Sequence, residues 1–296
     1  MVWLILSVSS AFFLGVYEVT KKHALRDNAV WLVLLFGTFS SAIIFLPLII
    51  LSATGILITE NFFYVPVVNA REHFLIILKT VIVLTSWVFS YTSLKHLPIT
   101  IASPIRATGP VWTLFGALII YNEQINTVRW VGLMITLLFF FLFSIAGKKE
   151  SISFKSNKWV WFAILGTIFS AASGLFDKFL IREIDRMSVQ AYFSIYQVIL
   201  LTPVVIVIRK TMKNPPKFIW RLSIPLIGVI LVIADFLYFY ALDYPDSLIS
   251  VVSVVRRGSV IVSFLFGALL FKEKNIKHKA ILLVGILAGI IILFLG

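Results

Sequence analysis

Three arginines lie inside stretches of the chain that are otherwise apolar. Arg106 interrupts residues 98–121, and Arg256 and Arg257 interrupt residues 247–271. A charge in the hydrocarbon of a bilayer costs at least ~2.5 kcal/mol, so a charge in a membrane span needs a partner or a function. Because guanidinium presents a rigid fork of donors that suits carboxylate or phosphate, these residues predict a substrate-binding site for an anionic group.

Arg106 and Arg257 are the first candidates for this site. Each precedes the tripeptide Gly-Ala-Leu by ten residues. Adjacent helical residues point about 100° apart, so only one of Arg256 and Arg257 can face a cavity squarely. Arg256 is then expected to orient its neighbour or to bond to another helix. The alternative for Arg106 is a structural role, in which it binds backbone carbonyls exposed by Pro104 and Pro110.

Four further charged residues are candidates with other roles. Lys79 and Asp235 come at similar depths, about 8 and 10 Å inside the ends of their apolar stretches, which predicts an ion pair or a gate. Glu18 and Asp177 lie nearer the ends of theirs and are candidates for proton coupling. The alternative for Glu18 is a surface ion pair with Lys22, four residues further on.

Other side chains add less to the predicted chemistry. Tyr91 and Tyr240 are expected to line a cavity, with ordinary packing as the alternative. The histidines lie in or beside polar connections without ligand spacing, so neither a metal site nor a cofactor is expected. No Gly-rich phosphate loop ends in Gly-Lys-Ser or Gly-Lys-Thr, so any transport would be secondary.

The composition shows what kind of element must position these residues. Of 296 residues, 60% are hydrophobic and 13% are charged, 27 are Phe, and there is no Cys. The mean hydropathy is +1.03. A soluble domain is about half apolar and about a quarter charged. These values exclude a soluble enzyme, a disordered chain and a coiled coil, and they predict a polytopic, all-α integral membrane protein.

Ten apolar stretches reach or nearly reach the roughly 20 residues that a membrane-spanning helix needs. They cover residues 2–20, 29–51, 74–94, 98–121, 127–146, 159–181, 187–208, 222–242, 247–271 and 280–296. Lys and Arg concentrate in the connections that follow the odd-numbered stretches. The positive-inside rule places those connections in the cytoplasm and both termini outside. Most of the net charge of +13 is therefore an orientation signal, and nucleic acid is not an expected partner.

The two halves of the chain repeat each other. Gly15-Val-Tyr-Glu18 parallels Gly174-Leu-Phe-Asp177, and the spacing from arginine to Gly-Ala-Leu recurs after Arg106 and Arg257. Five spans are an odd number, so a tandem second copy must be inverted. We expect a 5 + 5 inverted repeat around a central cavity. Residues 1–146 and 159–296 form the two five-helix repeats, and residues 147–158 form a cytoplasmic linker.

The stretch from Pro98 to Leu118, followed by Asn122-Glu123 and Trp130-Val-Gly, resembles the EamA repeat of the drug/metabolite transporter superfamily. Residues 244–273 repeat this pattern, and the resemblance covers nearly the whole chain. It implies ten helices in two inverted halves and substrates that range from amino acids to sugar phosphates. Arg106 and the pair Arg256-Arg257 are also similar to basic residues that hold substrate phosphate in plastid phosphate translocators.

These observations predict a secondary transporter, not an enzyme, that moves a small anionic or zwitterionic metabolite by alternating access. An amino acid or organic acid crossing the plasma membrane is favoured. The alternatives are a sugar-phosphate exchanger, a lipid-carrier flippase and a membrane-embedded enzyme acting on lipid-linked substrates. A proton or counter-solute is an expected partner. Gly285-Ile-Leu-Ala-Gly289 could support a homodimer, with packing inside the chain as the alternative.

Overall fold

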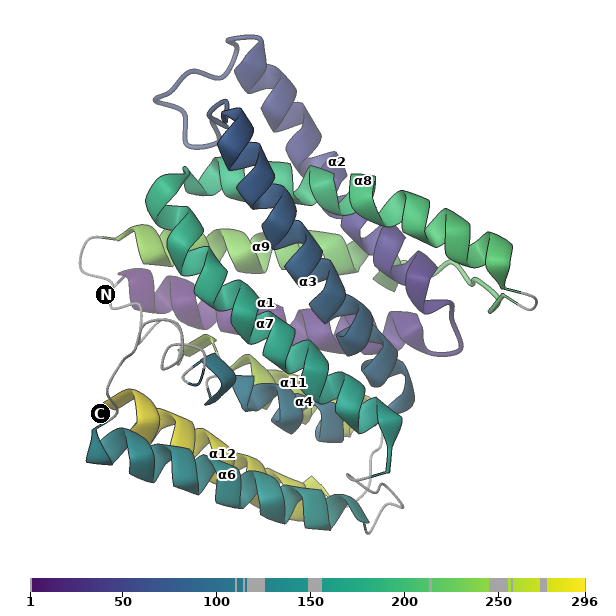
Figure 1. Ribbon diagram of the computed structural model, residues 1–296, viewed down its shortest axis with the longest axis vertical. Helices are drawn as coiled ribbons and strands as arrows, with labels where there is room; N and C mark the ends of the chain where they lie inside the picture. Colours follow the sequence, from purple (N-terminus) through teal and green to yellow (C-terminus); the bar gives the residue numbers. More distant parts are fainter. Residues whose placement is uncertain are drawn as a thin grey trace.

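The computed structural model describes residues 2–109, 111–113, 115, 126–148, 156–212, 215–244, 255–256, 258–271 and 276–295. Apart from short connections these residues are helical, and no strand occurs among them. Figure 1 shows the helices α1 (Val2–Leu25), α2 (Val30–Ala53), α3 (Ala70–His96), α4 (Ile99–Ala107), α6 (Thr127–Lys148), α7 (Lys158–Glu183), α8 (Arg186–Thr211), α9 (Ser223–Asp243), α11 (Ser259–Phe271) and α12 (Ile276–Leu295).

Several of these helices have the length and composition of membrane spans. Within the described residues, α1, α2, α3, α8 and residues Lys158–Ile181 of α7 qualify, as do residues Ser223–Ala241 of α9. Shorter apolar helical stretches cover Trp130–Leu142 of α6 and Ser259–Leu270 of α11. A bilayer offers backbone groups no water to bond, and helices satisfy those groups internally. The predicted class of all-α membrane protein is therefore confirmed.

Polar side chains at the helix starts explain where two of the long helices begin. Asn69 accepts a hydrogen bond from the backbone N of Glu72, whose carboxylate accepts one from the backbone N of Asn69. This capping box starts α3. Asp185 accepts hydrogen bonds from the backbone N of Met187 and Ser188 and caps α8 in the same way.

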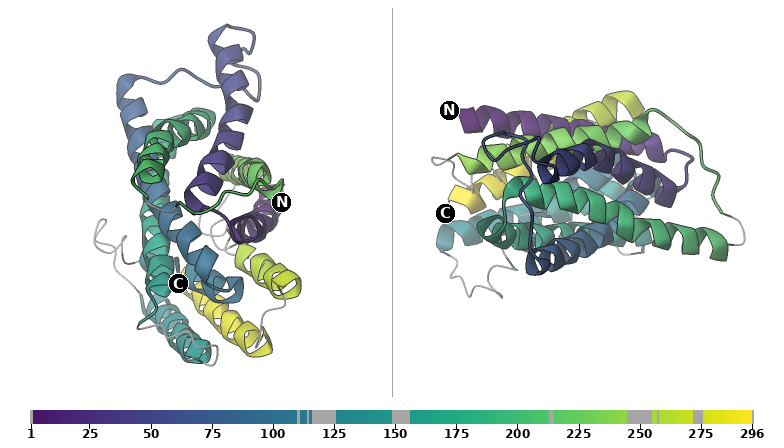
Figure 2. Two further views of the ribbon diagram at one scale, coloured as in Figure 1. Left: turned by 90° about the vertical axis from the view of Figure 1, so that its right-hand side faces the viewer. Right: turned by 90° about the horizontal axis from the view of Figure 1, so that it is seen from above.

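The most extensive helix contacts join the first half of the chain to the second. α1 packs along α9, α3 along α7, and α6 along α12, which lie side by side at one end of the molecule (Figure 2). Exchanging each helix for its counterpart in the other half converts the α1–α9 contact into α7–α3, and α2–α9 into α8–α3. The contacts α2–α8 and α6–α12 convert into themselves. The two halves are thus interlocked and share one core.

Glycines allow α6 and α12 to approach closely. A side chain added at Gly285 would meet the ring of Phe139, and one added at Gly289 would meet Thr136 and its backbone. The small-residue face of α12 is therefore used inside the chain, as the intramolecular alternative predicted.

Replacing Gly289 by Ala should destabilise the protein by about 1 to 2 kcal/mol, because the added methyl overpacks the α6–α12 contact. Thermal unfolding in detergent measures this loss. Gly174→Ala is the matched control, since among the described residues no atom beyond the neighbouring turns of α7 lies within 4 Å of the added methyl. The stability of this variant should not fall. Equal melting temperatures for the two variants would contradict this description of the α6–α12 contact.

Candidate functional site

A central cavity of about 210 Å³ lies among α1, α3, α4, α7, α8, α9 and residue 256. Its volume equals that of about seven waters at roughly 30 Å³ each, which suits a small solute. Aromatic side chains in its wall include Trp87, Phe193 and Tyr238. The charged residues that line it are Lys21, Lys79, Arg106, Asp177, Asp235 and Arg256.

Arg106 reaches the cavity from the short helix α4 and forms an ion pair with Glu18 of α1. Its side chain is 32% exposed, whereas that of Glu18 is 8% exposed. Both residues also line a second, smaller cavity of about 40 Å³. Among the described residues, Arg106 therefore pairs with a carboxylate. The structural alternative had instead expected it to bind backbone carbonyls.

Glu18 is buried within the protein, which the surface-pair alternative did not predict. α1 continues to Leu25, seven residues beyond Glu18, so the carboxylate is buried. Its partner on the same helix is Lys21, whose Nζ lies 2.8 Å from Oε1. The expected surface pair with Lys22 is wrong: the Lys22 ammonium donates to the carbonyl oxygens of Leu94, at 2.6 Å, and Leu97.

The expected ion pair between Lys79 and Asp235 is also wrong. Lys79 pairs with Asp177, because α3 packs along α7. Asp235 of α9 pairs with Arg256. All four residues line the cavity. The prediction for Lys79 and Asp235 rested on similar depth, and depth does not determine which helices are neighbours.

Arg256 bonds to a neighbouring helix, as one of its two expected roles required. Besides the ion pair with Asp235, its guanidinium carbon lies 3.9 Å from the centroid of the Tyr238 ring on the same helix α9. Within the described part of the chain, its buried Nε has no hydrogen-bond partner. Arg257 lies outside the described residues, and so does the Gly116-Ala-Leu segment.

Neither of the tyrosines expected to line the cavity does so. Tyr91 is 1% exposed and lies behind Tyr17, which does line the cavity. The ring of Tyr240 lies 5.0 Å from that of Phe62 between centroids, away from the cavity, and the Arg186 guanidinium carbon lies 5.3 Å from its centroid. Packing, the alternative for both residues, is what the structure shows.

Among the described residues, Lys21 is the charged cavity residue that sequence reasoning missed. It follows the predicted span of residues 2–20, which made it a connection residue. A signal was present, because Lys21 comes three residues after Glu18 and residues three apart share a helix face.

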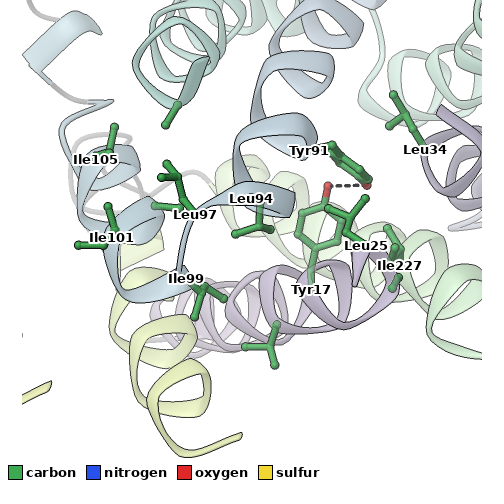
Figure 3. Close-up of a cluster of buried hydrophobic side chains, with 14 of the residues drawn as sticks. Tyr17, Leu25, Leu34, Tyr91, Leu94, Leu97, Ile99, Ile101, Ile105 and Ile227 are labelled. Carbon is green, nitrogen blue, oxygen red and sulfur yellow. Dashed lines mark hydrogen bonds between the residues drawn. The ribbon is translucent and has the colours of Figure 1, made fainter. Parts of the chain in front are cut away.

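Tyr17, which lines the cavity, also belongs to a cluster of buried hydrophobic side chains. Figure 3 shows the hydroxyls of Tyr17 and Tyr91 facing each other, with Leu25, Leu94 and Leu97 nearby, and the two oxygens are 3.2 Å apart. The ammonium of Lys95 also donates to the carbonyl oxygen of Asn28, at 2.8 Å. These contacts tie the end of α1 to the end of α3.

A bundle of apolar helices interlocked around a small, charged cavity is the architecture of a membrane protein that handles a polar solute. The model of the EamA-like transporter family matches residues 1–145 and again residues 157–295, and the chain belongs to this family. Members of the family are transporters of the drug/metabolite superfamily. No curated protein matches the chain.

Proposed function

We propose that this protein is a secondary transporter that moves a small anionic or zwitterionic metabolite, an amino acid or an organic acid, across the plasma membrane by alternating access. The observation that carries the proposal is the charged lining of the central cavity. Four basic side chains, among them Arg106, face two aspartates in a space of amino-acid size. Ionisable groups within spans are expensive and mark the path of a substrate or ion.

The topology belongs to the same proposal. All ten predicted spans cross the membrane as two inverted five-helix halves, with both termini outside. The exchange of equivalent helix contacts between the two halves supports this arrangement. A binding site at the interface of inverted repeats can be exposed to either side by rocking one group of helices against the other.

The lining suits a solute that carries both charges. A carboxylate would bind the fork of Arg106, with Arg257 as its predicted partner, and an ammonium group would bind Asp177 or Asp235. The two aspartates already have cationic partners, so a solute must compete for them. Because a carboxylate has two oxygens, an aspartate can bind the ammonium group of the solute while it keeps its present cationic partner.

Solute counterflow in proteoliposomes tests the proposal. The liposomes contain no lipid-linked substrate, and the labelled solutes are L-alanine, L-lactate, L-malate, glycerol 3-phosphate and choline. Accumulation of one or more of the first four is expected, and choline should stay outside. Transport of choline alone, or turnover of a lipid without any solute flux, would contradict the proposal.

The topology predicts opposite accessibility of two introduced cysteines. The natural chain has no Cys, so Asn157→Cys and Asp246→Cys each carry a single thiol. In intact cells an impermeant maleimide should label Asp246→Cys directly and Asn157→Cys only after permeabilisation. The reverse pattern would show that the distribution of Lys and Arg does not set the orientation.

A further inference from the structure

Besides Arg106, Glu18 contacts a second cation, Lys21. We propose that Lys21 is a permanent counter-ion of Glu18, so that Arg106 can exchange Glu18 for the anionic group of a transported solute. Lys21 is then a positioning residue that acts through Glu18. The inference rests on the proposed function, because it takes Arg106 as the residue that binds the anion.

The three side chains differ in exposure. The side chain of Lys21 is 2% exposed, that of Glu18 8% and that of Arg106 32%. A solute in the cavity therefore reaches Arg106 most easily. Lys21, which also lines the cavity, is the least exposed of the three.

Lys21 is fixed by contacts that do not involve Arg106. Its Nζ donates to Glu18 Oε1 at 2.8 Å and lies 4.6 and 4.9 Å from the ring centroids of Tyr17 and Tyr91. The hydroxyls of those two rings are themselves within hydrogen-bond distance, at 3.2 Å. Because aromatic faces attract a cation, the ammonium should stay in place when Arg106 moves.

The same carboxylate oxygen, Glu18 Oε1, contacts both cations. When Arg106 turns to a solute, Glu18 keeps Lys21, so no unpaired carboxylate remains in the protein interior. The smaller cavity touches both Glu18 and Arg106 and is lined by the hydroxyls of Ser103 and Ser263. Its volume of about 40 Å³ holds about one water, which could bond to Glu18 after the exchange.

The charge of the cluster favours a particular class of anionic group. Two cations and one carboxylate leave one positive charge, so a group with a single negative charge neutralises the cluster without uptake of a proton. Without Lys21, the Arg106–Glu18 pair would be neutral and the incoming anion would add an unbalanced charge. By themselves, these three described residues therefore favour a monocarboxylate or the carboxylate of an amino acid over a dianion, and Arg257, outside the described residues, is not part of this count.

Labelling of Arg106 with phenylglyoxal tests the role of Lys21 without any solute. Rates are measured by peptide mass spectrometry, with the exposed Arg71 as internal reference. In Lys21→Met, Glu18 has Arg106 alone and should hold it more tightly, so labelling of Arg106 should slow by about threefold to tenfold. In Glu18→Gln, and in the double variant that combines Lys21→Met with Glu18→Gln, Arg106 should be labelled faster than in wild type. In Lys21→Arg it should be labelled at the wild-type rate. Labelling of Lys21→Met at the wild-type rate or faster would overturn the inference.

Affinities for L-alanine, L-lactate, L-malate and glycerol 3-phosphate provide the second readout. Lys21→Met should weaken the binding of the solutes that wild type binds, and adding Glu18→Gln should restore their affinity. If Lys21 were merely structural, adding Glu18→Gln would not restore the affinity. If the double variant binds as poorly as Lys21→Met while Arg106→Gln weakens binding as the proposed function expects, the inference fails and the proposed function stands. If wild type binds none of the four, the proposed function fails and the inference fails with it.

Discussion

Replacing Arg106 by Gln is expected to weaken the binding of anionic solutes by about 2 to 3 kcal/mol, or roughly 30- to 150-fold, the usual value of a hydrogen bond to a charged group. Gln keeps a donor but loses the charge and the fork. Arg106→Lys should lose less affinity, because lysine keeps the charge and lacks only the bidentate geometry. Glu18 keeps Lys21 as its partner in both variants, so the fold should survive.

Equilibrium binding of the four anionic and zwitterionic solutes to purified variants measures this loss. Arg71→Gln is the matched control, since the Arg71 side chain is 71% exposed and pairs with Glu183 at the surface. Its affinity should stay within about 0.5 kcal/mol of wild type. A folded Arg106→Gln variant with unchanged affinity, or a set of substrates that are all cationic, would refute the assignment.

Replacing Lys79 by Met is expected to destabilise the protein by about 3 to 5 kcal/mol, because removing one partner of a buried pair leaves the other charge uncompensated. The side chain of Lys79 is 5% exposed and that of Asp177 is 23% exposed, so little solvent screens them. Thermal unfolding in detergent measures the loss. Adding Asp177→Asn to Lys79→Met should recover much of it.

Two double-mutant cycles distinguish the pairing in the structure from the pairing that depth predicted. Lys79→Met should couple strongly to Asp177→Asn and add independently to Asp235→Asn, which belongs to the pair with Arg256. Coupling to Asp235 and additivity with Asp177 would instead restore the pair expected from sequence.

The fold class and the family could be predicted from the sequence because hydropathy and the repeated motif are local properties of the chain. Apolar stretches of about 20 residues are sufficient to indicate spans, and the family match covers both repeats. Arg106 could be predicted as a cavity residue for the same reason. Its charge lies inside an apolar stretch, and this can be recognised without knowing which helices are its neighbours.

The partners of the charged residues could not be predicted, because they depend on which helices touch. Rise per residue gave similar depths for Lys79 and Asp235, yet α3 contacts α7, and Asp177 was closer. Lys21 was missed because α1 extends beyond its predicted end. A helix boundary moved by five residues changed a connection residue into a buried counter-ion.

The central claim is that the charged cavity is where the solute binds, and a single introduced thiol tests it directly. Ser170 lines both cavities together with Arg106, so Ser170→Cys places the chain's one thiol beside the predicted anion site. An impermeant methanethiosulfonate should label this thiol and block counterflow. The transported carboxylate solute should slow the labelling, whereas choline should not, and a control thiol at the exposed Asn61 should react at the same rate with or without solute. A solute that is transported by Ser170→Cys yet leaves its labelling rate unchanged would contradict the account.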